Sequence, residues 1–274
     1  MFNEFYNWYF LETGRTPEGL FSWQHILSVT LTLALFGFLG ISIAKKAKTK
    51  KGQRIFVGLM GLFIVLVQVD KYIFLIHEST DTFWNVIVGN LPMYLCDMQI
   101  YMIPIAFFAK GRFKNICFDF IGIWGILMGI FGTYLAGNIY PVHCVISFSA
   151  INSLLNHSIS FSVGLFAFFA GLSTMEKKNI PFTIGILVGF MTIALIVDYV
   201  DNHNFMFFFD GGGTPFGLFK ALVKDNLILY QIEIYILQTG YMGLFYLFYH
   251  LISKKVAQKQ AQRAAQKQEA QQNQ

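Results

Sequence analysis

The chain has 274 residues, of which 55% are hydrophobic and only 13% are charged, and its mean hydropathy is +0.53. A soluble domain is typically about 25% charged, so this composition excludes an ordinary soluble globular protein. The net charge of +5 indicates basic loops beside a membrane and not a nucleic-acid partner.

Seven apolar runs are long enough to cross a bilayer, whose hydrocarbon core needs about 20 helical residues. Because backbone groups inside lipid must be hydrogen-bonded internally, we expect each run to form a helix. The predicted fold is therefore an all-α membrane protein, a bundle of about seven transmembrane helices. The runs cover residues 22–44, 55–77, 91–109, 115–136, 150–173, 180–200 and 228–252.

The basic residues predict how the bundle is oriented, because loops rich in Lys and Arg stay on the cytoplasmic side. The links after the first, third and fifth runs and the C-terminal tail together hold 16 of the 20 basic residues. We therefore expect the N-terminus outside and the C-terminus inside. The chain then divides into a short extracellular segment (1–20), a seven-helix transmembrane bundle (21–253) and a basic, Gln-rich cytoplasmic tail (254–274).

Polar and ionisable side chains recur at one depth of the predicted bundle, in its outer third. Cys96 and Asp97 lie near the start of the third run, and His157 lies about two turns into the fifth. An ionisable group inside a membrane is costly, so it marks a functional site by default. We expect these residues to face an outward-opening cavity. Its other predicted lining residues are Tyr94, Gln99, Asn156, Ser160, His203, Asn204, His25 and Glu233.

Structural roles for the same residues stay open. A buried histidine in a membrane bundle often makes a hydrogen bond between helices, and a lone membrane cysteine is usually a small hydrophobic residue. Cys96, Cys117 and Cys144 form no C-x-x-C pair, and no short ligand motif joins them to the histidines. We therefore expect no metal site and no cofactor.

Four short motifs resemble the YwaF family of bacterial integral membrane proteins. NLPMYLCDM (90–98) is similar to that family's LP-x-x-LC signature, and SLLNHSISFSVG (153–164) to its serine/histidine-glycine stretch. FSWQHI (21–26) and DNHNFMFF (201–208) are similar to its elements on the first helix and after the sixth. The resemblance covers residues 20 to 252 or so, and it implies a multi-pass protein of the bacterial plasma membrane.

The YwaF family is similar to animal membrane acyltransferases that remodel phospholipids through a cysteine and a histidine. The resemblance therefore implies Cys96 as nucleophile and His157 as its general base. An acyl chain would pass from a phospholipid to Cys96 as a thioester, and then to a lysolipid or another lipidated acceptor. Tyr94, Gln99 or Asn204 would stabilise the oxyanion. Two alternatives remain: a transporter whose polar cavity binds a solute, and a membrane scaffold without enzymatic activity.

Overall fold

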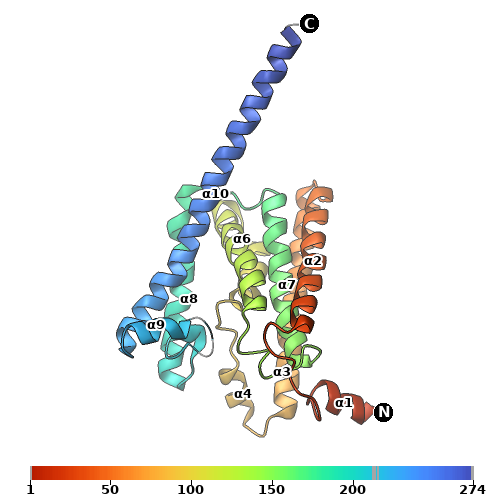
Figure 1. The fold of residues 1–274 in the computed structure, drawn as a ribbon, viewed down its shortest axis with the longest axis vertical. Helices are drawn as coiled ribbons and strands as arrows, with labels where there is room; N and C mark the ends of the chain where they lie inside the picture. The colour runs from red at the N-terminus through yellow and green to blue at the C-terminus, as the bar shows by residue number, and fades with distance from the viewer. Residues whose placement is uncertain (1, 212–213, 215, 273–274) are drawn as a thin grey trace.

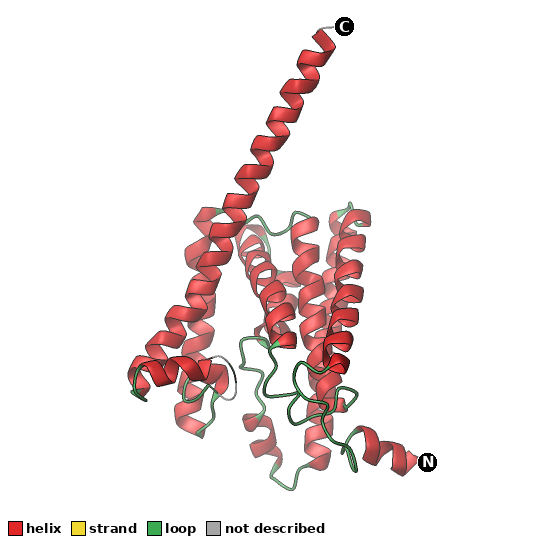
Figure 2. Cartoon of the chain, in the orientation of Figure 1, coloured by secondary structure: helices red, strands yellow, loops and turns green. Residues whose placement is uncertain are grey.

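The protein is all-helical in the part of the chain that its computed structural model describes, residues 2–211, 214 and 216–272. Helices make up 75% of the structure, and these residues contain no β-strand (Figure 2). The prediction of an all-α protein is thus confirmed. Residues 273–274 of the predicted tail lie outside the described residues.

Ten α-helices and two 3₁₀ helices follow one another along the described chain (Figure 1). They are α1 (Phe2–Tyr9), α2 (Trp23–Lys46), α3 (Lys50–Glu78), α4 (Phe83–Gly89), α5 (Met98–Phe108), α6 (Gly111–Tyr134), α7 (Phe148–Phe169), η1 (Lys177–Asn179), α8 (Ile180–Asp201), η2 (Phe205–Phe207), α9 (Phe216–Leu222) and α10 (Leu227–Gln272).

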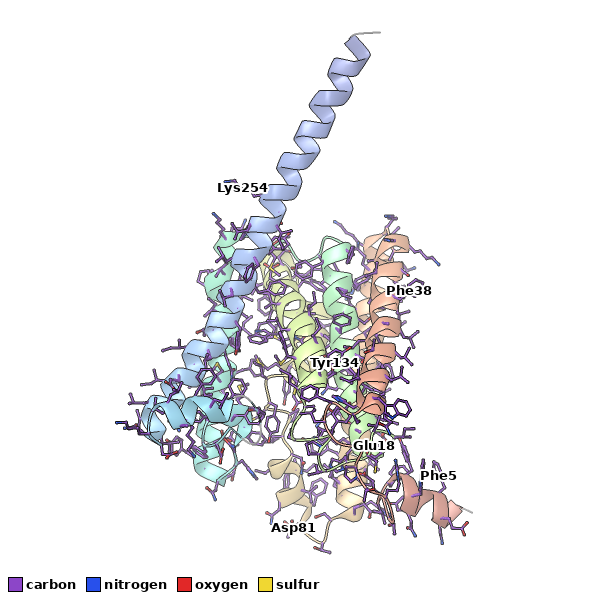
Figure 3. The ribbon with its side chains drawn as sticks, in the orientation of Figure 1. Phe5, Glu18, Phe38, Asp81, Tyr134 and Lys254 are labelled. Carbon is purple, nitrogen blue, oxygen red and sulfur yellow. The ribbon has the colours of Figure 1, made fainter. Side chains whose placement is uncertain are left out.

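Among the described residues, four helical segments are long and apolar enough to cross a bilayer: α2, α3, α6 and Lys177–Asp201, which combines η1 with α8. Their outward faces carry large exposed apolar side chains, such as Leu35 and Phe38 on α2 and Leu59 on α3. Figure 3 shows Phe38 on the outer side of α2. A long apolar exterior of this kind is suited to lipid and not to water.

Helix α7 is central to the bundle, since it packs against α6, α2 and α3. Glycines allow the close approach to α6 and α2. A Cβ added at Gly125 of α6 or at Gly40 of α2 would collide with backbone atoms of α7, at Ser160 and Ser162 respectively. Small residues at such crossings are the usual means by which membrane helices pack.

Helices α8 and α10 pack against each other, with α9 against α10. In Figure 1 they form one side of the molecule, while α2, α3 and α7 form the other. Helix α10 continues past the ends of the other helices, so its C-terminal half stands clear of the bundle (Figure 1). That half is rich in Ala, Gln and Lys, which are good helix formers without tertiary support.

The third predicted helix, 91–109, is wrong at its beginning. Helix α5 starts only at Met98, and residues 91–97 form an irregular segment with a turn in which the Asp97 N–H donates to the Tyr94 carbonyl at 2.9 Å. Pro92 explains the difference, because a proline disfavours helical geometry at the residue before it and supplies no N–H. As a consequence, Cys96 lies in a turn and not within a helix.

Candidate functional site

The site is built around Asp97, the last residue before α5. Its Oδ1 accepts the Cys96 S–H at 3.7 Å and the Asn156 Nδ2–H at 3.0 Å. Asp97 is 8% exposed and Cys96 is half-buried. One carboxylate oxygen therefore connects the thiol in the turn to the central helix α7.

Helix α3 adds a positive charge to this arrangement. Lys71 interacts electrostatically with both Cys96 and Asp97. It was not among the predicted site residues, although a lysine inside an apolar run is a visible signal. Asp70, its neighbour in sequence, points about 100° away and interacts instead with Tyr9. The positive charge of Lys71 thus favours the ionised forms of Cys96 and Asp97.

His157 lies one residue beyond Asn156 on α7, and its ring lies against α6. A Cβ added at Gly132 would overlap the ring, and the imidazole is hydrogen-bonded to the Met128 backbone. Its Nδ1 is buried and has no hydrogen-bond partner among the described residues. The structure therefore holds an imidazole with one available nitrogen close to Asn156, while the thiol itself donates to Asp97.

Tyr94 connects the turn to the segment after α8. Its ring packs edge-on against Phe205, with centroids 5.5 Å apart, and tilted against Phe207 at 5.6 Å. Asp198 of α8 holds this segment through Oδ1, which accepts the Phe205 N–H at 2.7 Å. The other oxygen of Asp198 is buried without a partner in the described chain. Asp198 is thus a second buried carboxylate near Tyr94, which sequence reasoning left out of the site.

His203 and Asn204 follow α8 and have different surroundings. His203 packs on Phe205 and against Gly89, and it lines a cavity of about 460 Å³ with polar residues of the α3–α4 region. The amide of Asn204 is used within its own loop, since Oδ1 accepts the Phe209 N–H at 2.8 Å and Nδ2 donates to the Asp210 carbonyl at 2.9 Å. Asn204 therefore shapes the loop and has little left to offer an oxyanion.

His25 belongs to a different cluster from Cys96. Its Nδ1 accepts the Phe21 N–H at 3.1 Å, its Nε2 donates to the Thr133 carbonyl at 3.1 Å, and its ring lies on Tyr140. Both nitrogens are occupied, so the imidazole fastens the start of α2 to the end of α6. This is the structural role of a buried histidine that the sequence left open.

The remaining predicted residues differ in whether their side-chain polar atoms have hydrogen-bond partners. Ser160 donates to the Asn156 carbonyl at 2.8 Å, one turn back along α7. Gln99 is fully buried in the first turn of α5, with neither amide atom partnered in the described chain, and one carboxylate oxygen of Glu233 on α10 is in the same state. Gln99 is three residues from Cys96, which makes its amide the nearest free donor along the sequence.

The described residues contain no cluster of side chains that could bind a metal ion. No three or more of their His, Cys, Asp and Glu side chains converge as metal ligands would. Cys96, Cys117 and Cys144 are all free thiols.

The TMEM164 family model matches the chain over residues 20–249. The matched range contains Cys96, Asp97, Asn156 and His157, together with all of α2 to α9. No curated protein and no solved structure matches the chain.

Proposed function

Because this chain belongs to the TMEM164 family, a family of multi-pass membrane proteins, we propose that it is a membrane-embedded acyltransferase whose nucleophile is Cys96. The resemblance of its motifs to the YwaF family supports the same assignment. The observation that carries the proposal is the thiol of Cys96, set in a turn and in contact with the Asp97 carboxylate that Asn156 holds. A nucleophile requires a nearby proton acceptor and access to its substrate.

The short length of α5 supports a reaction site within the membrane. Its 11 residues rise by about 16 Å, roughly half of a hydrocarbon core of about 30 Å. Residues 91–97 would complete the crossing as irregular backbone. Such backbone is tolerated at membrane depth only where protein buries it or where it lines a cavity. All seven of these residues are at least half-buried.

The proposed topology has seven crossings, by α2, α3, α5 with its preceding turn, α6, α7, α8 and α10. The N-terminus is outside and the C-terminus inside, in the plasma membrane of a bacterium. The basic links support this orientation. The site around Cys96 then lies in the outer half of the bilayer, where phospholipids approach it laterally.

The proposed reaction has two steps. The base takes the proton of the Cys96 thiol, and the resulting thiolate attacks the ester carbonyl carbon of a phospholipid. The ester C–O bond breaks, and the protonated base gives its proton to the departing lysolipid oxygen. The acyl chain is now a thioester on Cys96. The hydroxyl of an acceptor lysolipid then attacks the thioester, gives its proton to the base, and releases the thiolate. One ester is consumed and one is formed, so the exchange needs no added cofactor.

We assign His157 as the general base and Asp97 as the residue that positions the thiol. The available Nδ1 of His157 supports its role. Asn156 and His157 point about 100° apart on α7, and the His157 ring lies against Gly132. The proposal therefore requires a rotation of the imidazole, or one bridging water, to connect Nδ1 to the thiol. The unpartnered amide of Gln99 is the proposed oxyanion donor, a role worth about 3–4 kcal/mol of transition-state stabilisation.

Acyl exchange in a defined bilayer tests the proposal. The purified protein is placed in nanodiscs with a phospholipid whose acyl chain is isotopically labelled and with an unlabelled lysolipid, and transfer is followed by mass spectrometry. We expect transfer by the native protein and by Cys117→Ala, and none by Cys96→Ala. Cys117 is a matched control because it is a buried free thiol on α6.

Three results would contradict the proposal. Full transfer by Cys96→Ala would move the nucleophile elsewhere. Absence of transfer with any lipid class, together with saturable binding of a solute, would support a transporter; absence of both would support a scaffold.

A further inference from the structure

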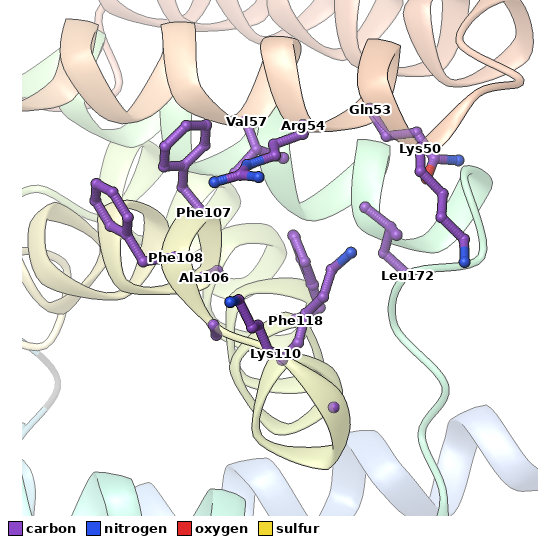
Figure 4. Close-up of a pocket in the computed structure, with 13 residues that line it drawn as sticks. Lys50, Gln53, Arg54, Val57, Ala106, Phe107, Phe108, Lys110, Phe118 and Leu172 are labelled. Atoms are coloured by element: carbon purple, nitrogen blue, oxygen red, sulfur yellow. The ribbon is translucent and has the colours of Figure 1, made fainter.

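A second pocket lies at the opposite end of α5 from Cys96, between the beginnings of α3 and α6 (Figure 4). It has a volume of about 260 Å³. Since α5 spans the two, the pocket is about 16 Å from the turn that holds the thiol. It therefore belongs to neither the Cys96 site nor the cavity beside His203.

Four cationic side chains line this pocket, and no lining residue is acidic. The cations are Lys50, Arg54, Lys110 and Lys114. None of them has an ion-pair partner among the described residues, where the recorded pairs join His77 to Glu78, His143 to Glu12 and Lys178 to Glu176. Like charges that converge without a counter-ion repel one another, so an anion within the pocket would relieve a cost that the protein otherwise bears.

Arg112 shows what an engaged cation looks like in the same region. Its guanidinium donates to the Asn179 side chain at 3.2 Å and to the Lys178 carbonyl at 2.6 Å, and it lies over Phe182. It does not line the pocket. The four lining cations differ from Arg112 because, within the described chain, none of their charged groups is held by such hydrogen bonds.

Two of the cations lie over aromatic rings. The Arg54 guanidinium lies 4.7 Å from the centre of the Phe107 ring, and the Lys114 ammonium lies 5.6 Å from that of Phe118. Figure 4 shows the charged ends of Arg54 and Lys110 directed toward the space between α3 and the start of α6. Val57 and Leu172 add apolar surface. The pocket thus combines a cationic opening with an apolar wall.

Helix α6 contributes a further positive potential. It begins at Gly111, and no side chain caps its first turn. The N–H groups of an uncapped first turn carry partial positive charge and bind phosphate well. Here this potential adds to the four cations.

We propose that this pocket binds the phosphate of an anionic phospholipid. The cations and the helix N-terminus attract the phosphate, and the absence of any carboxylate leaves nothing to pair with the ammonium of a zwitterionic head group. The apolar wall takes the part of the lipid next to the head group. A free phosphate shares the charge but cannot use this wall, which is why we assign the lipid.

The test measures binding of soluble short-chain lipids to the full chain in a non-ionic detergent by native mass spectrometry. The probes are dioctanoyl phosphatidylglycerol, dioctanoyl phosphatidylcholine and inorganic phosphate. We expect phosphatidylglycerol to bind at least about tenfold more tightly than phosphatidylcholine, and its affinity to fall as salt rises. We expect inorganic phosphate to bind more weakly than phosphatidylglycerol. Equal binding of the two lipids, or phosphate as tight as phosphatidylglycerol, would overturn the assignment.

Variants locate the binding. The double variant Arg54→Gln/Lys110→Gln should lose at least about tenfold in phosphatidylglycerol affinity, because a charge-assisted hydrogen bond is of that order. The double variant Lys45→Gln/Lys46→Gln removes the same charge from the exposed end of α2, outside the pocket, and should bind as the native protein does. Arg54→Lys keeps the charge and should stay within about threefold. If both double variants lost the same affinity for phosphatidylglycerol, general surface charge would explain the binding, and the assignment of the lipid to this pocket would be overturned.

Discussion

Asn156 Nδ2 lies 3.0 Å from Asp97 Oδ1, so the central helix α7 holds the carboxylate that the Cys96 thiol contacts. The hydrogen bond joins two parts of the chain that are far apart in sequence. It fixes the turn before α5 relative to the bundle, and with it the position of the thiol.

Replacement of Asn156 by Ala should lower the rate of acyl transfer by about 10- to 100-fold, because a hydrogen bond to a charged group contributes about 1.5–3 kcal/mol. Asn152→Ala is the matched control: Asn152 lies one turn earlier on α7 and donates to the Val67 carbonyl at 2.8 Å, not to Asp97. Transfer rates in nanodiscs measure the effect. Equal losses in both variants would show that only the packing of α7 matters.

Gly132 controls where the His157 ring lies. A Cβ at this position would overlap three atoms of the ring, so Gly132→Ala should displace the imidazole and destabilise the protein by about 1–3 kcal/mol. Gly243→Ala places the same methyl group on α10 with nothing within 4 Å and should be neutral or stabilising. Thermal unfolding in detergent compares the two. A Gly132→Ala protein with native stability and native transfer rate would contradict this placement of His157.

Asp119 of α6 is fully buried and holds the segment between α7 and α8. Its carboxylate accepts from the Ser173 side chain, the Thr174 and Met175 N–H groups and the Asn179 side chain. Asp119→Ala leaves these donors unpaired, so the expected loss is above about 3 kcal/mol of unfolding free energy. Denaturation in detergent measures it.

The control for Asp119 is Glu176, an acidic residue of the segment that Asp119 holds. Glu176→Ala removes only a surface ion pair with Lys178 and should change stability by less than about 1 kcal/mol. If Asp119→Ala lost no more unfolding free energy than Glu176→Ala, the hydrogen bonds of Asp119 would make no net contribution to stability.

Acid should release the N-terminal segment from the loop that precedes α7. Burial raises the pKa of Glu12, but hydrogen bonds from the Cys144 N–H at 2.5 Å and the His143 ring at 2.7 Å outweigh it and lower the pKa below 4.5. The ionised form is the one that folding stabilises. The contribution of ionised Glu12 to stability is therefore present above pH 4.5, and it is lost as the pH falls through the lowered pKa of Glu12.

Hydrogen exchange of the peptide containing Glu12 measures this release. Protection should be constant from pH 7 to pH 5, after correction for intrinsic exchange, and should fall below pH 4.5. Glu12→Gln should show weak protection throughout that range. Protection in Glu12→Gln equal to that of the native protein would show that other contacts, such as that of Arg15 with the Ile146 carbonyl, suffice.

The proposed topology predicts which engineered cysteines an impermeant thiol reagent reaches in intact cells. In a background without native cysteines, Asp81→Cys should be labelled from outside, and Lys50→Cys only after the membrane is opened. The reverse pattern would invert the orientation and would move the Cys96 site to the cytoplasmic half of the bilayer.

The all-helical character of the fold follows from the long apolar runs, but the start of α5 does not. The run 91–109 is continuous in hydropathy, and only Pro92 indicates the turn that sets Cys96 apart from a helix. Sequence also gives the depth of a residue more readily than its direction. Asn156 and His157 are neighbours at one depth, yet the first faces Asp97 and the second faces Gly132.

Which helices meet also escapes a single sequence. The sequence groups His25 with Cys96 because both lie near the same predicted surface, whereas the contacts of His25 are Phe21, Thr133 and Tyr140. Lys71 on α3, in contrast, interacts electrostatically with the thiol and the carboxylate. Depth alone cannot separate these cases, because it does not specify the rotation of a helix about its axis or its neighbours.

A covalent acyl intermediate at Cys96 is the central feature of the proposed reaction. Intact-protein mass spectrometry after incubation with phospholipid and no acceptor should show one added acyl chain, located by peptide mapping on the peptide that contains Cys96. Hydroxylamine should remove it, because a thioester is labile to that nucleophile. His157→Ala should slow its formation by about 10²- to 10⁴-fold, and Cys117→Ala should leave it unchanged. Transfer of labelled acyl chains by a Cys96→Ala protein, with no adduct on any cysteine, would contradict the account.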